Sequence, residues 1–404
     1  MQYWYQNEWV ADKGLKEGRF EVYNEYFFRS LDDVQLQWKV KKHSGSVSLK
    51  GIAPQQRKTF VDAHLQQILQ RVLEHHADED VTVDFVFTRQ GRVEARQQFL
   101  VQTYRFPQVE PQQATVDTEQ TKSYVKLTAG GTTLTVGKQT GMIDYLDVDG
   151  KPVLADRQSI TPEFWRAPTD NDYGARLQQR FVAWKSPAMK VTDCTVNGNT
   201  IVARLTMPDV KANLTLTYTL QPSGEIVVRQ QLQPTGETKD QWLFRYGMQL
   251  QLPSRYSNIT YSGRGPHENY IDRHASEFLG VYTSRVADEY FPYVRPQESG
   301  NHTDVRWFRV TDDAQRGLEF YAAVPIECSA LPYLASDLDG GVDKNRSAVL
   351  HSGDLVERPV TQIHVQQRQM GLGCVNSWGG WPEKQYLLPL GDYDFTYVIR
   401  PVRP

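Results

Sequence analysis

The stretch Val81-Thr82-Val83-Asp84-Phe85-Val86-Phe87 carries an apolar side chain at every second position. Successive side chains of a β-strand point to opposite faces of a sheet, so a period of two gives one buried face and one wetter face. The β-branched and aromatic side chains of this stretch also favour a pleated sheet. The stretch therefore predicts a half-buried β-strand.

The same alternation recurs on both sides of this stretch and is the dominant pattern of the chain. It is clearest in Arg19-Phe20-Glu21-Val22-Tyr23-Asn24, Val34-Gln35-Leu36-Gln37-Trp38-Lys39-Val40, Asn213-Leu214-Thr215-Leu216-Thr217-Tyr218 and Glu225-Ile226-Val227-Val228-Arg229. Turn signals such as Asp149-Gly150-Lys151-Pro152 and Ser223-Gly224 occur at spacings that suit antiparallel sandwiches rather than βαβ units. The sequence predicts an all-β protein.

One segment has a helical period instead. Its apolar residues are Leu65, Ile68, Leu69, Val72 and Leu73, ahead of His75-His76. This i, i+3, i+4, i+7, i+8 stripe lies on one face of a helix. We expect that helix to pack across one end of a sandwich.

A boundary is expected where two prolines and a polar run interrupt the strand pattern, at Phe106-Pro107-Gln108-Val109-Glu110-Pro111-Gln112-Gln113. The residues before it match an immunoglobulin-like sandwich in size, and the remainder suits a larger two-sheet structure. We therefore expect an immunoglobulin-like domain over 1–108, a linker over 109–121 and a large β domain over 122–404.

Composition argues against two classes of partner. The net charge of the 404 residues is −3, and lysine and arginine are scattered among slightly more acidic residues, so no basic face for nucleic acid is expected. No apolar run approaches the ~20 residues of a membrane-spanning helix. Sugar and protein partners stay open.

The cysteines and histidines encode no metal site or disulfide framework. The three cysteines, Cys194, Cys328 and Cys374, are far apart and odd in number. The histidines at 267, 274, 302 and 364 are too dispersed for a local zinc signature. We expect three free thiols and no metal bound by this chain.

Two glycine-containing segments are the best candidates for a binding site. Trp165-Arg166-Ala167-Pro168-Thr169-Asp170-Asn171-Asp172-Tyr173-Gly174 has the composition of a highly specified loop. In Asn376-Ser377-Trp378-Gly379-Gly380-Trp381-Pro382, short neighbours leave an indole face open, which suits stacking against a pyranose ring. The alternative is that Trp378 caps a sandwich edge and that Trp381 is the exposed ring.

Several segments resemble, in the same order, the C-terminal part of the long bacterial β-galactosidases of glycoside hydrolase family 2. They are Glu25-Tyr26-Phe27-Phe28-Arg29, Ile52-Ala53-Pro54-Gln55, the Trp165 to Gly174 stretch, Gly263 to Arg273, Pro292 to Gly300, and Gly371 to Trp378. The resemblance runs from about Gly18 to Tyr397. It implies an immunoglobulin-like domain followed by a galactose-mutarotase-like β-supersandwich.

The resemblance also implies how this chain takes part in a reaction. In the family, the catalytic glutamates and the Mg and Na ligands lie in a barrel domain, so no catalytic residue or cofactor is expected in this chain. The terminal domain lends a tryptophan under the sugar, matched by Trp378, and a mobile loop, matched by Asp170, Asn171, Asp172 and Gly174. The chain departs from the family pattern at Cys374-Val375-Asn376, where acidic residues are expected, so the leaving-sugar preference stays open.

The resemblance leaves the origin of the chain open. It is expected to be an excised C-terminal fragment, with a separately encoded small subunit as the alternative. In either case its partners are a galactoside and the catalytic barrel portion, within an enzyme expected to be a homo-oligomer. The compartment, cytoplasmic or periplasmic, is not specified.

Two other functions remain in view. A stand-alone carbohydrate-binding module would be built on Trp378 and Trp381. A mutarotase-like epimerase would need its own general acid and base, for which His302 with Glu268 or Glu298 are the candidates.

We predict that folding needs neither metal nor a disulfide, because alternating strands supply apolar cores and the cysteines show no pairing pattern. Excess chelator and, separately, reductant should leave the melting temperature unchanged in calorimetry. A drop of more than a few degrees with either reagent would reveal a structural site that the sequence hides.

Overall fold

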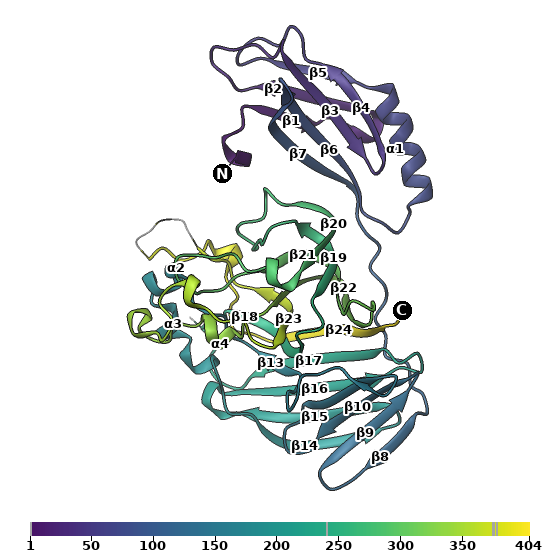
Figure 1. Cartoon of the computed structure of the whole chain (residues 1–404), viewed down its shortest axis with the longest axis vertical. Helices are drawn as coiled ribbons and strands as arrows, with labels where there is room; N and C mark the ends of the chain where they lie inside the picture. The colour runs from purple at the N-terminus through teal and green to yellow at the C-terminus, as the bar shows by residue number, and fades with distance from the viewer. Residues whose placement is uncertain (1, 240, 374–375, 377–378) are drawn as a thin grey trace. The chain divides into compact units, whose positions relative to one another are not determined.

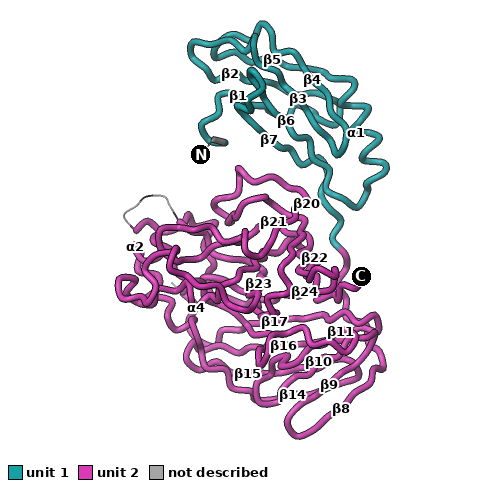
Figure 2. Tube along the Cα trace, in the orientation of Figure 1, with its two compact units in different colours: residues 1–106 teal, residues 107–404 magenta. Residues whose placement is uncertain are grey.

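The computed structural model describes residues 2–239, 241–373, 376 and 379–404. The chain divides into two compact units, residues 1–106 and 107–404 (Figure 2). Each unit has a large hydrophobic cluster of its own. We refer to them as unit 1 and unit 2.

Unit 1 is a sandwich of two antiparallel sheets (Figure 1). In its described residues one sheet has the order β1-β2-β5 and the other β4-β3-β6-β7. The strands are β1 (Glu8–Asp12), β2 (Arg19–Asn24), β3 (Val34–Val40), β4 (His43–Ser48), β5 (Arg57–Val61), β6 (Val81–Arg89) and β7 (Arg92–Gln102). Three strands facing four is an immunoglobulin-like arrangement, which confirms the expected fold.

Helix α1 (Ala63–His75) closes the core of unit 1. Its buried residues are Leu65, Ile68, Leu69 and Val72, as the helical stripe predicts. Asp62 is the N-cap, and its carboxylate accepts from the backbone N–H of His64 at 2.9 Å and of Leu65 at 3.0 Å. The other carboxylate oxygen accepts from the indole N–H of buried Trp38 at 2.8 Å. One side chain thus joins the helix to strand β3.

Unit 2 is also built of antiparallel sheets. In its described residues a small sheet has the order β12-β11-β10-β9-β8, and a large one runs β13-β18-β23-β22-β24-β17-β16-β15-β14, with β19, β20 and β21 attached through β22. The first strands are β8 (Asp117–Gln120), β9 (Tyr124–Ala129), β10 (Thr132–Gly137), β11 (Ile143–Val148), β12 (Lys151–Pro152), β13 (Thr161–Glu163), β14 (Lys190–Asn197), β15 (Thr200–Met207), β16 (Ala212–Leu220) and β17 (Ile226–Pro234). The others are β18 (Arg245–Pro253), β19 (Asn258–Gly265), β20 (Phe278–Arg285), β21 (His302–Thr311), β22 (Gly317–Leu331), β23 (Val360–Gln369) and β24 (Tyr393–Val402).

The all-β prediction is confirmed, and the five alternating segments correspond to strands β2, β3, β6, β16 and β17, with only Glu225 just outside its strand. Strand β8 lies inside the segment expected to be a linker, 109–121, and pairs with β9. All of its residues are exposed, so it has no apolar face that an alternation could reveal.

The α-helices in the described residues of unit 2 are short: α2 (Asp170–Gly174), α3 (Leu177–Arg180) and α4 (Ala335–Leu338). None of the helices in the described part of the chain is long and apolar enough to cross a bilayer.

We predict that Asp62→Ala destabilises unit 1 by about 2 kcal/mol, because the change removes a helix cap and leaves the buried Trp38 indole without an acceptor. Asp62→Asn should cost about half of that, since Asn is an equally good cap but has a single acceptor oxygen, so the Trp38 indole N–H still loses its partner. Hydrogen exchange of the α1 amides in the full chain measures the loss of stability in both variants. Equal protection in the parent and the Ala variant would contradict the assigned role.

Candidate functional site

The stretch expected to be an open loop contains a helix. Asp170, Asn171, Asp172 and Gly174 belong to α2, a single capped turn of five residues. The Asp172 backbone N–H donates to the Thr169 hydroxyl at 3.2 Å, and the Thr169 N–H donates back to the Asp172 carboxylate at 2.8 Å. This capping box explains why the stretch, expected to be a loop, forms a helical turn instead. The Thr-x-x-Asp signature of the box is visible in the sequence, but the same Asn, Asp and Gly residues are also typical of turns.

A buried arginine fixes α2 to the unit. The Arg166 guanidinium is fully buried and donates to the Asp172 carboxylate at 3.1 and 2.8 Å. It also donates to the carbonyl oxygens of Met370 and, at 3.0 Å, Gly371. Asp172 is 1% exposed, so its carboxylate positions the helix and does not face a ligand.

The structure brings α2 together with the segment that contains Trp378. Asn171 donates to the carbonyl oxygen of Leu372 at 3.3 Å. Further along, Gly379 approaches Gly174 so closely that a Cβ on Gly379 would lie 2.5 Å from the Gly174 carbonyl oxygen. Residues on both sides of Trp378 therefore contact α2, while Trp378 itself lies outside the described residues.

Asp272 provides a second anchor for this segment. Its carboxylate accepts from the backbone N–H groups of Leu372 at 3.0 Å and Gly373 at 2.9 Å. A Cβ on the preceding Gly371 would lie 2.6 Å from that carboxylate, so glycine is what allows the close approach. We refer to α2 together with residues 371–373, 376, 379 and 380 as the joined edge.

Trp381 is a packing residue rather than an open platform. It is half-buried, and its ring lies 4.9 Å from that of Trp242 and 6.1 Å from that of Phe181, both edge-on. The Arg180 guanidinium lies 5.3 Å from the same ring. These contacts argue against the alternative that makes Trp381 the exposed ring of the pair.

Asp170 and Tyr173 connect α2 to residues Gly341 and Lys344, which follow helix α4. The exposed Asp170 carboxylate forms an ion pair with Lys344. The Tyr173 hydroxyl donates to the carbonyl oxygen of Gly341 at 3.0 Å, and burial raises the pKa of that hydroxyl. Of the two carboxylates proposed for the site, Asp170 is the one that solvent reaches.

Unit 2 also contains a buried ionic cluster centred on Arg245, which Gln369 links to Arg166. Its guanidinium forms ion pairs with Glu163, at 3.3 Å, and with Glu298. His364 Nδ1 lies 2.6 Å from the same Glu163 oxygen. Burial raises the pKa of Glu163, but the charges of Arg245 and His364 outweigh burial and leave that pKa below its ordinary value.

Glu327 is the buried acid with the weakest compensation in this region. Its carboxyl oxygens accept from the Gln369 backbone N–H at 3.2 Å and the Asn301 amide at 3.1 Å. Burial raises its pKa to about 7, against an ordinary value of 4.5. No cation lies close enough to form an ion pair with Glu327 among the described residues.

The acid and base expected for an epimerase do not meet. His302 is fully buried, and its Nε2 lies 2.6 Å from Glu289, not from Glu268 or Glu298. Glu268 accepts from Ser299 at 3.0 Å, from the Gly300 N–H at 2.7 Å and from Arg273 at 2.5 Å. These carboxylates hold loops together and offer no open acid–base pair.

The described residues contain no group of three or more His, Cys, Asp or Glu side chains placed to hold a metal. Of the three cysteines, Cys194 and Cys328 are free thiols, and Cys374 lies outside the described residues.

The fold defines a class: an all-β protein whose larger unit is built of antiparallel sheets and carries a short helix, α2, that buried Arg166 anchors. The model of the β-galactosidase small chain family matches residues 128–399. The chain belongs to this family.

Curated relatives carry the same name over much longer chains. A β-galactosidase of Priestia megaterium is 29% identical, and the match covers 98% of this chain and 38% of that protein. A β-galactosidase of Lactobacillus delbrueckii subsp. bulgaricus is 34% identical over 54% of this chain and 21% of its own length. The chain therefore spans well under half of these relatives.

Solved structures with a similar arrangement of strands include two epimerases. A putative aldose 1-epimerase from Escherichia coli K12 covers 70% of this chain and 98% of its own, with 11% identity and a TM-score of 0.37. A galactose 1-epimerase from Lactobacillus acidophilus covers 72% and 98%, with 7% identity and a TM-score of 0.37.

We predict that Glu327 makes stability depend on pH. Its folded pKa of about 7 exceeds the unfolded value of 4.5, so its stabilisation is fully present below about pH 4.5 and is lost as the pH rises through about 7. Glu327→Gln should remove this dependence, so that from pH 5 to 8 the variant loses about 2 kcal/mol less of its unfolding free energy than the parent. Urea unfolding across this range measures the difference.

The matched control is Glu237→Gln, which changes an exposed glutamate of the same unit and should follow the parent at every pH. Identical pH slopes for Glu327→Gln and the parent would show that Glu327 ionises normally in the folded chain.

Proposed function

We propose that this chain is the non-catalytic portion of a retaining β-galactosidase that hydrolyses terminal β-D-galactosides such as lactose. The catalytic carboxylates would come from a barrel portion, on the same polypeptide or on a large subunit. The family description, a small chain, favours a separate large subunit. This chain would supply one wall of the sugar site.

The observation that carries the proposal is the joined edge. The two segments singled out for sugar contact are 200 positions apart in the chain, as the Asn171–Leu372 hydrogen bond illustrates with a separation of 201 residues. Hydrogen bonds from Arg166 and Asn171 hold them side by side, and Asp272 fixes the second segment from another loop. A site that positions a ring against a sugar needs such a rigid support.

In this proposal Trp378 stacks on the sugar, and α2 with its flanking residues closes over it. Asp170 and Asn171 would offer polar contacts, and Gly174 would give the backbone freedom to move. Because Asp172 is anchored, we expect α2 to move as one body. The mobility itself stays a prediction.

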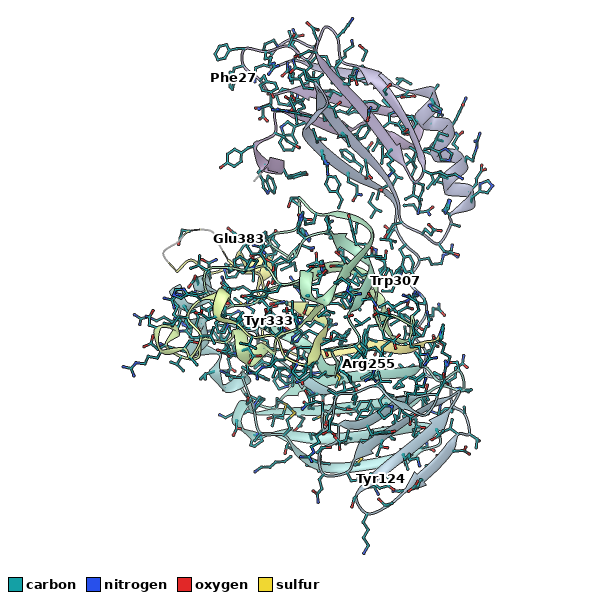
Figure 3. The ribbon with its side chains drawn as sticks, in the orientation of Figure 1. Phe27, Tyr124, Arg255, Trp307, Tyr333 and Glu383 are labelled. Carbon is teal, nitrogen blue, oxygen red and sulfur yellow. The ribbon has the colours of Figure 1, made fainter. Side chains whose placement is uncertain are left out.

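Unit 1 carries a surface that suits a protein partner. Phe27 and Phe28 are 71% and 98% exposed, and Figure 3 labels Phe27 at the edge of the sandwich. Neighbouring exposed aromatic rings are typical of interfaces. Both belong to the segment that resembles the family before the terminal domain, which favours contact with the catalytic portion.

We expect the isolated chain to be inactive on a chromogenic β-galactoside, since glycoside cleavage needs a positioned carboxyl pair. Activity should appear when the chain is combined with the catalytic portion of a close relative. A chain that cleaves the substrate alone after removal of host enzymes, or a catalytic portion equally active without the chain, would refute the proposal.

In the assembled enzyme, Trp378→Ala should raise KM for lactose roughly ten-fold, because a lost stacking contact of ~1 kcal/mol or slightly more approaches one decade in affinity. The melting temperature should stay close to that of the parent. Trp4→Ala, which removes a tryptophan that is 67% exposed in unit 1, is the matched control and should change neither quantity. A destabilised Trp378→Ala variant with a normal KM would indicate a ring that packs at an edge.

A further inference from the structure

One face of the large sheet in unit 2 is polar, although its other face is a hydrophobic core. Along β18, Met248, Leu250 and Leu252 are buried in that core. The alternate residues Gln249 and Gln251 lie on the opposite face. This face of β18 therefore carries two neighbouring polar side chains, not one isolated polar residue.

The neighbouring strands extend this face. Gln249 is directly opposite Thr161 of β13 and His364 of β23, and Gln251 is opposite Gln362. The Gln362 amide donates to the Gln249 side-chain oxygen at 3.1 Å. Cross-strand neighbours on one face are close enough to act on one ligand.

This face forms the floor of a cavity of about 450 Å³. The volume falls within the ~300–1,000 Å³ typical of small-molecule sites. Its lining includes Gln249, Gln251, Gln362, Trp165, Trp184 and Asp339. Lys185 and Ser336 line the cavity and are exposed, so solvent reaches it.

The charges around the cavity are already neutralised by one another. Lys185 lies 2.7 Å from the Asp339 carboxylate, which also accepts from the Trp165 indole N–H at 2.8 Å. Glu163 is paired with Arg245 and His364. A charged ligand would have to break one of these pairs, so the cavity favours a neutral one.

The remaining chemistry suits hydroxyl groups. Each glutamine amide offers both donors and an acceptor, which matches hydroxyls that donate and accept at once. The buried indoles of Trp165 and Trp184 add an apolar wall, and sugars present both hydroxyl edges and C–H faces. We propose that this cavity binds a neutral saccharide of one or two pyranose rings.

The inference goes beyond the proposed function, because none of the residues of α2 lines this cavity. The test uses the full chain, titrated with galactose, glucose, lactose and galacturonate, with binding followed by saturation-transfer NMR. We expect binding of at least one neutral sugar, and weaker binding of the anionic galacturonate than of galactose.

Gln251→Leu should weaken that binding roughly ten-fold, because it removes one amide at nearly constant volume. Gln233→Leu, at an exposed strand glutamine of β17 that does not line the cavity, is the matched control and should bind as the parent does. Ser336→Trp places a large ring at an exposed rim position and should abolish binding without disturbing the core.

No binding of any neutral sugar, tighter binding of galacturonate, or equal binding by the parent, Gln251→Leu and Ser336→Trp would each overturn the proposal. Trp378→Ala separates this site from the proposed galactosidase role. That variant should keep the binding described here, whatever it does to turnover in the assembled enzyme.

Discussion

Two buried guanidinium groups organise unit 2. Arg245 and Arg166 are both fully buried, and a charge in such a place is tolerated only when carboxylates and hydrogen bonds compensate for lost water. The compensating groups come from different segments: Glu163 from β13, Glu298 from the loop before β21, and Asp172 from α2. Gln369 stands between the two guanidinium groups, at 3.4 and 3.5 Å from them.

This requirement decides where the loops lie. The loop that carries Glu298 must approach Arg245, and its backbone then hydrogen-bonds to Ala167 at 3.1 Å. The same ion pairs neutralise the floor of the glutamine-lined cavity. Replacement of one partner would leave an uncompensated buried charge, which typically costs 3–5 kcal/mol. Specific loop positions thus follow from electrostatics more than from apolar packing.

Sequence reasoning recovered what depends on local periodicity. Alternation located β3 and β6, and the apolar stripe located α1, because burial of one face imposes those patterns. It missed β8, whose residues are all exposed, and it took the capping box at Thr169 for a turn. The expectation that the regions around residues 171 and 372 belong to one site came from the family resemblance alone, not from a pattern in the residues.

The ionic cluster could not be predicted, because its members are far apart in the chain. Arg245 and Glu298 are 53 positions apart, and Glu163 and His364 are 201 apart. No local pattern marks such pairs, since a buried arginine and a surface arginine look alike in a sequence. The useful sign would have been charged residues inside strand-like segments, such as Glu163 and Arg245, where a core position should be apolar.

The contact between Gly174 and Gly379 has a mechanical consequence. Neither residue has a side chain that could rotate to absorb a shift, so backbone meets backbone at van der Waals distance. A displacement of α2 by even a fraction of a bond length is passed directly to the peptide that follows Trp378. A side chain added at either glycine would therefore push α2 and the segment that begins at Gly379 apart, and neither segment could adjust without moving the other.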